Sequence, residues 1–140
     1  MDGRLASPKE ALRELERGGE DEIHEWAKNH ESIFRELDSH QADAARKIIN
    51  NPKYKELFDI DKEIPEADPF VIALAVVEQR KNRIIPEHWI VVADEGSKRP
   101  GKKPRIPDVC RDDDYQIECI RTLDMFEREG WQFWRFKSPA

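Results

Sequence analysis

The sequence predicts a helix-rich α/β domain whose sheet is small and mostly parallel. The first observation is the longest apolar run in the chain, residues 70–77, which follows Asp68-Pro69. An acidic residue and a proline are typical of a helix start, so this run predicts a helix that is buried on nearly all sides. The second observation is the β-branched run at residues 89–93, which has no polar alternation. A strand of that kind is covered on both faces, as in a parallel sheet between helices.

The overall composition fits one folded domain and excludes several classes of protein. The chain has 140 residues, of which 39% are charged, and a net charge of −6. A surface with that charge does not attract nucleic acid non-specifically, so a nucleic-acid site would need a local basic cluster or a bridging metal. The two cysteines and four histidines show no zinc-ligand spacing. Because no signal peptide or membrane span is evident, we expect a cytoplasmic protein with reduced thiols.

The first helix is predicted to begin at Ser7-Pro8-Lys9-Glu10. These residues combine a capping serine, a proline at the first helical position and a glutamate three residues after the serine. Gly18-Gly19 ends the helix. Glu14 lies at the margin of its apolar face, so its side chain either pairs with Arg17 at the surface or points into a cleft.

Two further helices precede the buried one. A short helix begins at residues 20–22, with His24 expected at the surface and its apolar positions at Ile23, Trp26 and Ala27. A longer helix is predicted over residues 32–49, where apolar residues follow the three-and-four spacing of an amphipathic helix. Residues 50–52 stop it, residues 52–58 form one more helical turn, and residues 59–65 form a loop.

The chain after the buried helix alternates between apolar and charged segments. The strand at residues 89–93 ends at Asp94-Glu95-Gly96, where open α/β sheets place their ligands. A last helix is predicted over residues 115–128, capped by Asp114, and a final aromatic strand over residues 131–136. The residues of this last helix that we expect to be buried are Ile117, Ile120, Leu123 and Phe126.

A basic loop at residues 96–105 lies between that strand and the last helix. It is either a solvated loop or a segment that grips phosphate beside the acidic strand end. Its positive charges are Lys98, Arg99, Lys102, Lys103 and Arg105.

Several acidic residues lie at the ends of predicted elements and could share one cleft. They are Glu14, Asp68, Asp94 or Glu95, and Asp108. Carboxylates brought together repel one another, and a divalent cation removes that penalty. Hard oxygen ligands select Mg²⁺ or Mn²⁺, and such a metal can activate water against a phosphodiester. The pattern therefore gives metal-dependent phosphodiester hydrolysis as a hypothesis.

Four segments of the chain form a pattern in order and spacing. The segments are Ser-Pro-Lys-Glu-Ala-Leu-Arg-Glu-Leu at 7–15, Ala-Asp-Pro-Phe-Val-Ile-Ala at 67–73, Val-Val-Ala-Asp-Glu at 91–95 and Lys-Pro-Arg-Ile-Pro-Asp-Val-Cys at 103–110. Together they resemble the PIN-like family, in an uncharacterised bacterial and archaeal branch. The resemblance implies a three-layer α/β/α fold and ribonuclease activity that depends on Mg²⁺ or Mn²⁺. It also implies RNA as the substrate and the role of toxin in a toxin–antitoxin pair with an antitoxin protein as partner, and it allows a homodimer.

The resemblance also assigns roles to individual residues. Glu14 matches a helix glutamate that helps to bind metal, and Asp68 matches the central metal-site aspartate. Glu95 matches the acid that closes the strand, with Ala93 where the family usually has threonine. Asp108 lies in a motif of the branch and is a possible accessory residue.

One feature of the PIN-like pattern has no counterpart in this sequence. PIN-like proteins begin with a strand that carries an aspartate, whereas this chain starts at the later Ser-Pro helix. We therefore expect the sheet to lack its first strand and the metal site to lack one ligand, which would weaken or abolish catalysis. The alternative function is a catalytically inactive relative that binds a partner protein through an exposed sheet edge.

Overall fold

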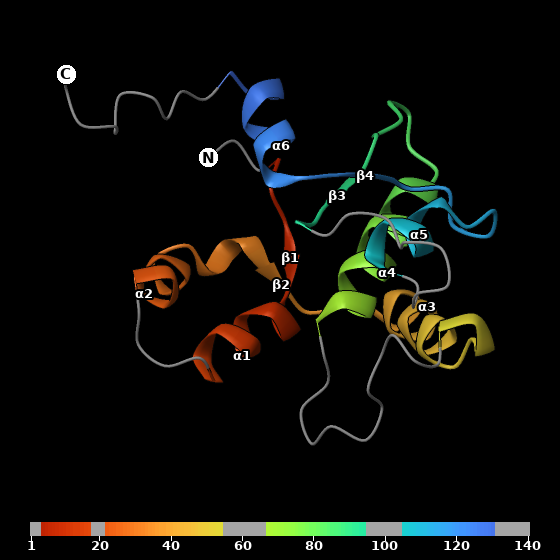
Figure 1. The fold of residues 1–140 in the computed structure, drawn as a ribbon, viewed down its shortest axis with the longest axis horizontal. Helices are drawn as coiled ribbons and strands as arrows, with labels where there is room; N and C mark the ends of the chain where they lie inside the picture. The colour runs from red at the N-terminus through yellow and green to blue at the C-terminus, as the bar shows by residue number, and fades with distance from the viewer. Residues whose placement is uncertain (1–3, 18–21, 55–66, 95–104, 131–140) are drawn as a thin grey trace.

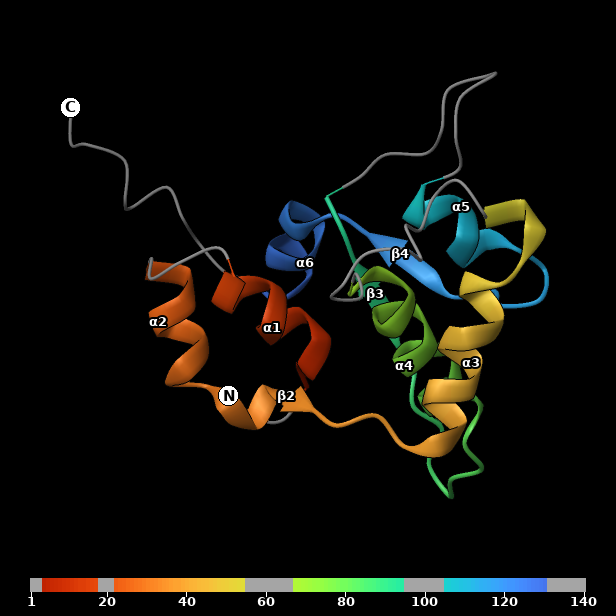
Figure 2. The ribbon, with the colours of Figure 1, turned by 90° about the horizontal axis from the view of Figure 1, so that it is seen from below.

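A computed structural model describes residues 4–17, 22–54, 67–94 and 105–130. The fold is helix-rich α/β (Figures 1 and 2), which confirms the predicted class. Helices α1 and α2 lie at one end of the molecule, α3 and α5 lie at the other, and α4 lies between them. In chain order the elements are β1 (Ser7–Pro8), α1 (Lys9–Arg17), α2 (Glu22–Lys28), the 3₁₀ helix η1 (Glu31–Ile33), β2 (Phe34–Arg35), α3 (Ser39–Ile49), the 3₁₀ helix η2 (Pro52–Tyr54), α4 (Asp68–Arg80), β3 (Ile90–Val92), α5 (Ile106–Arg111), β4 (Glu118–Ile120) and α6 (Thr122–Arg128).

The described strands form two small sheets, and both sheets are parallel. Strand β1 pairs with β2, with Ser7 opposite Phe34, and β3 pairs with β4, with Val91 opposite Cys119. The N–H of Ala93 continues the second ladder by donating to the carbonyl of Ile120 at 2.9 Å. Strand β3 therefore has the position and the parallel partner that its continuous apolar run predicts.

Helix α4 is the buried helix that the apolar run predicts. It packs against α3 on one side and against β3 on another, and it also contacts β1. Ile72 and Ala73 are completely buried in a core cluster that also contains Val91 and Val109. The helix begins at Asp68-Pro69 and ends at Arg80, as the start signal and the charged tail indicate.

A second, smaller apolar cluster lies beneath α1 and α2. Its buried members are Ala27, Ile33 and Phe34, and the apolar side of α1 packs against them. The predicted buried face of α2 is only partly correct, because Ile23 and Trp26 are exposed whereas His24 is buried. Trp26 instead stacks on the ring of His30, with the ring centroids 4.5 Å apart.

Two boundaries in the N-terminal half differ from the prediction. Ser7-Pro8 forms strand β1 rather than the start of a helix, so a short strand precedes α1. The helix predicted over residues 32–49 is divided, and only Ser39–Ile49 is α-helical. Asp38 starts α3 with a capping box, in which its Oδ1 accepts from Gln41 N–H at 2.7 Å and Gln41 Oε1 accepts from Asp38 N–H at 3.1 Å.

The helix predicted over residues 115–128 is also wrong. Its first part contains strand β4, and the helical part is only Thr122–Arg128. Gln116 has a φ of 49°, which breaks the chain direction just before β4. Asp114 therefore caps no helix, and Leu123 is 72% exposed rather than buried. Ile117 alone of the four expected core residues is fully buried.

Some predicted features lie outside the described residues. They are the loop at residues 59–65, most of the basic loop at 96–105 and the aromatic strand at 131–136.

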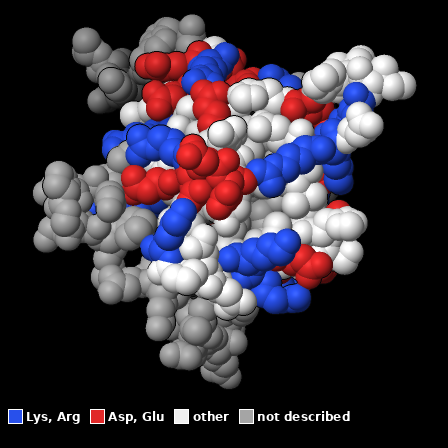
Figure 3. Space-filling model, turned by 90° about the vertical axis from the view of Figure 1, so that its right-hand side faces the viewer, with Lys and Arg blue, Asp and Glu red and all other residues white. Residues whose placement is uncertain are grey.

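Among the helices of the described part, none is long and apolar enough to cross a membrane. Figure 3 shows one face of the molecule, on which Lys and Arg side chains lie among Asp and Glu side chains.

Candidate metal centre

Glu14 reaches the N-terminal end of α4, the helix that begins at Asp68. Glu14 projects from α1, and its Oε1 accepts a hydrogen bond of 2.8 Å from the backbone N–H of Ala67. Ala67 is buried, occupies the cap position of α4 and directly precedes Asp68. The first N–H groups of a helix have no partner within the helix, so the Glu14 carboxylate satisfies a group that would otherwise lack one. The fold thus brings Glu14 to the residue that precedes Asp68, 53 positions away in the sequence.

The first turn of α4 presents the positive end of the helix dipole beside Asp68. Asp68 is the acidic residue of the first turn of α4, and it is partly buried. The backbone amides of Phe70 and Val71 donate to the carbonyl of Ala67, each at 2.9 Å, and so fix the geometry of that turn. Anionic groups at such a helix end are stabilised by the aligned peptide dipoles.

These two carboxylates fit a hydrated divalent cation better than a fully protein-bound one. Mg²⁺ commonly keeps several waters and binds proteins through one or two carboxylates. Across the part of the chain that the structure describes, no group of three or more His, Cys, Asp or Glu side chains is placed to hold a metal. Of the predicted metal ligands, Glu14 and Asp68 belong to this helix end, and Glu95 lies outside the described residues.

Asp94 contacts the start of α6, a partner that the sequence does not reveal. It follows β3 directly, and its Oδ1 accepts from the backbone N–H of Thr122 at 3.0 Å. Hydrogen bonds from the side chain and the backbone of Thr122 hold the pKa of Asp94 below its usual range. Asp94 therefore joins the end of β3 to the start of α6. Sequence reasoning missed Thr122, although a threonine at a strand-to-helix junction is a common hydrogen-bonding position.

Asp108 holds the first turn of α5. Its Oδ2 accepts from the backbone N–H of Arg105 at 2.8 Å, and its Oδ1 accepts from the Arg111 guanidinium at 3.1 Å. Both contacts lie within α5 and its cap, so this geometry gives Asp108 a capping role. Arg105 is exposed at the start of the same helix. The other predicted phosphate-gripping residues, Lys98, Arg99, Lys102 and Lys103, lie outside the described residues.

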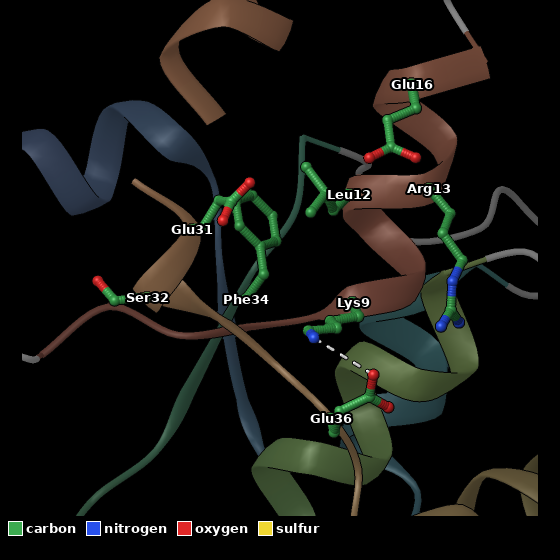
Figure 4. A pocket seen from close by; sticks show the side chains of 8 residues that line it. All are labelled: Lys9, Leu12, Arg13, Glu16, Glu31, Ser32, Phe34 and Glu36. Carbon is green, nitrogen blue, oxygen red and sulfur yellow. Dashed lines mark ion pairs between the residues drawn. The ribbon is translucent and has the colours of Figure 1, made fainter. Parts of the chain in front are cut away.

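A pocket of about 520 Å³ opens on another side of α1, between that helix and the η1–β2 segment (Figure 4). Leu12 and Phe34 are its apolar lining residues, and Lys9 pairs with Glu36 across it at 3.3 Å. Basic and acidic side chains alternate around it, so it has no single sign of charge for a metal or a phosphate backbone. None of the predicted metal ligands lines it. The remaining lining residues are Arg13, Glu16, Glu31 and Ser32.

Comparison with known proteins gives one match. A family model described as a domain of unknown function, DUF4411, matches residues 1–133. No curated protein and no solved structure matches the chain.

Proposed function

We propose that this chain, which belongs to the DUF4411 family, is a PIN-like ribonuclease that depends on Mg²⁺ or Mn²⁺. The observation that supports the proposal best is the 2.8 Å hydrogen bond from Ala67 N–H to Glu14. It brings the helix glutamate of the PIN-like pattern to the residue before the central aspartate, Asp68. The contact joins positions 53 residues apart in the sequence, so a carboxylate from α1 is held at the start of the buried helix.

In this proposal each candidate residue has a separate role in binding the metal or the RNA. Glu14 and Asp68 would hold the cation, which supplies charge neutralisation for a phosphodiester and lowers the pKa of a bound water. The Ala67 N–H orients Glu14, because it fixes one of the two carboxylate oxygens and leaves the other available. Glu95 would complete the acid set. The basic residues at positions 98, 99, 102, 103 and 105 would contact the RNA backbone, which carries affinity rather than sequence specificity.

The direct test is cleavage of a labelled single-stranded RNA in Mn²⁺ by the purified chain and three variants. Asp68→Asn and Glu14→Gln keep the size of each side chain and remove its charge. Asp43→Asn is the matched control, because Asp43 is an exposed acid on α3 whose partner is Arg46. We expect a loss of about 100-fold or more for Asp68→Asn and about 10-fold or more for Glu14→Gln, with no change for Asp43→Asn.

Equal activity in the wild type and Asp68→Asn would refute the nuclease assignment.

The toxin role is tested separately, by inducing the chain in bacterial cells and following growth. We expect growth arrest with the wild type and normal growth with Asp68→Asn. Arrest by both proteins would show that toxicity does not depend on this site.

A specific observation also favours the alternative, an inactive relative that binds a partner protein. The described residues contain no group of three metal-ligating side chains, and each two-stranded sheet leaves strand edges that pair with no described strand. Such edges can accept an extended segment of another protein. Calorimetric titration with millimolar Mn²⁺ separates the two functions, since heat that disappears in Asp68→Asn supports the nuclease and no heat in the wild type supports the binding module.

A further inference from the structure

The two cysteines of the chain lie side by side in the main core cluster. Cys110 is completely buried near the end of α5, and Cys119 is partly buried at the centre of β4. Neither forms a disulfide, and Cys119 packs against the cluster that contains Cys110, where α5 contacts β4. The interaction with Cys119 also raises the pKa of the Cys110 thiol. Neighbouring cysteines of this kind can form a disulfide when side-chain rotations bring the sulfurs to bonding distance.

Regular structure holds both residues in this arrangement. The backbone N–H of Ile117 donates to the carbonyl of Cys110 at 2.9 Å, and this bond turns the chain from α5 back into β4. The parallel pairing of β4 with β3 then fixes Cys119 opposite Val91. Backbone hydrogen bonds therefore place Cys110 and Cys119 next to each other.

We propose that Cys110 and Cys119 are a modification site that forms a reversible intramolecular disulfide with a peroxide as oxidant. The Cys119 thiol gives up its proton, and the sulfur of its thiolate attacks one peroxide oxygen. The O–O bond breaks, the departing oxygen takes up that proton, and the products are a sulfenic acid on Cys119 and water or an alcohol. The sulfur of Cys110 then attacks the Cys119 sulfur. The S–O bond breaks, an S–S bond forms, and the Cys110 proton leaves with the hydroxyl group as water. Two thiols are oxidised and one peroxide is reduced.

The environments of the two sulfurs set the order of these steps. Cys119 is the more exposed thiol, so a small peroxide reaches it first. The hydrogen bond with Cys119 and burial both raise the pKa of the Cys110 thiol, so Cys110 is a poor first nucleophile. Cys110 instead acts as the resolving thiol, because attack on a neighbouring sulfenic acid needs contact rather than exposure.

The disulfide would covalently fix α5 to β4. Its loop spans only residues 110–119, and it lies beside the turn that leads to Thr122 and Asp94. The inference rests on the contact between the thiols and not on the ribonuclease proposal. The formation of this disulfide can therefore be tested without measuring ribonuclease activity.

Peptide mapping of the whole chain tests the inference directly. The protein is treated with hydrogen peroxide, blocked with N-ethylmaleimide and digested with trypsin without reduction. Trypsin cuts after Arg105, Arg111 and Arg121, which places the two cysteines in separate peptides, 106–111 and 112–121. We expect mass spectrometry to detect these peptides joined in the wild type, with the loss of two hydrogen atoms, and released by dithiothreitol. The joined species is absent from Cys110→Ser and Cys119→Ser.

A second measurement separates the roles of the two thiols. In Cys110→Ser the sulfenic acid on Cys119 has no resolving partner, so dimedone should label Cys119 at least 10-fold more than in the wild type. Recovery of the two wild-type peptides unjoined after peroxide treatment would overturn the proposal. Disulfides that form between chains and vanish on dilution would overturn it as well.

Discussion

Replacing Glu78 with alanine removes the carboxylate that joins the end of α4 to the start of α3. Glu78 is buried, and its Oε1 accepts from Gln41 Nε2 at 2.8 Å and from Lys81 Nζ at 2.5 Å. Its Oε2 accepts from the Arg83 guanidinium at 2.5 Å. Gln41 also completes the capping box of α3, so the substitution affects both helices.

The expected loss in the free energy of unfolding is about 3 kcal/mol. Most of it comes from Gln41, because a buried amide left without its partner costs about 1–3 kcal/mol. Lys81 and Arg83 contribute less than a buried pair would, since their side chains are 43% and 25% exposed and regain water. For a domain of this size, a loss of that magnitude lowers Tm by about 10 °C.

The assay is thermal and urea unfolding followed by circular dichroism. Asp43→Ala is the control, because it removes an ion pair with Arg46 in which both side chains are more than half exposed. We expect that control to change stability by no more than about 0.5 kcal/mol. If Glu78→Ala and Asp43→Ala unfold at the same urea concentration, the proposed role of Glu78 in joining α3 to α4 is wrong.

The pH dependence of stability in the wild type and in Glu78→Gln gives an independent check. Burial raises the pKa of Glu78, but hydrogen bonds from Lys81 and Arg83 lower it more, so the folded pKa lies below 4.5. The charge of Glu78 therefore stabilises the fold fully above pH 4.5, and this contribution is lost as pH falls through the folded pKa. We expect the difference in stability between the wild type and Glu78→Gln to be constant near neutral pH and to shrink in acid.

Two further predictions test the surface cluster around Glu118 and the main core. Arg128 and His88 hold the pKa of Glu118 at about 2. Arg128→Ala should therefore raise the pKa of Glu118 towards 4.5, measured by NMR titration of its side-chain carboxyl. An unchanged midpoint would exclude Arg128 as the cause of the lowered pKa. Ile48→Ala should cost about 2–5 kcal/mol in urea unfolding, because Ile48 is completely buried. The matched control, Ile84→Ala, should cost less than about 0.5 kcal/mol because Ile84 is fully exposed.

The elements that the sequence predicted best are those in which several local signals agree. Helix α4 combines an acidic start, a proline at the first position and an apolar run, so its bounds and burial follow from residues 68–80 alone. Strand β3 is also predicted by agreeing signals, because a β-branched apolar run that ends in acidic residues is typical of a buried strand. The division of residues 32–49 has a local signal, the capping-box spacing of Asp38 and Gln41, but the apolar periodicity of the whole segment favours one continuous helix.

Strand β4 could not be predicted in the same way. Ile117, Ile120 and Leu123 recur at intervals of three, which is typical of a helix, and no glycine or proline interrupts them. The interruption is the left-handed conformation of Gln116, which a residue with a Cβ adopts only when the surrounding structure imposes it. Tertiary contacts therefore decide this segment, and the sequence pattern does not reveal them.

The candidate site was predictable only as a set of positions. The apolar margin of α1 left two options for Glu14, and the choice depends on the approach of Ala67 from a distant part of the chain. The partner of Asp94 was hidden for the same reason, because Thr122 reaches it only after β4 pairs with β3. Sequence periodicity places side chains on faces of elements, but it does not place those elements against one another.

The separation of the apolar residues into two clusters has a consequence for hydrogen exchange. The small cluster around Ala27 and Phe34 is built mostly from residues close in sequence, whereas α4 and its neighbours form the larger one. Units of this kind can open independently, with the smaller unit opening at lower free energy. The bond from Ala67 to Glu14 crosses between them. The Ala67 amide should therefore exchange together with the amides of α1, although it belongs by position to the more protected helix.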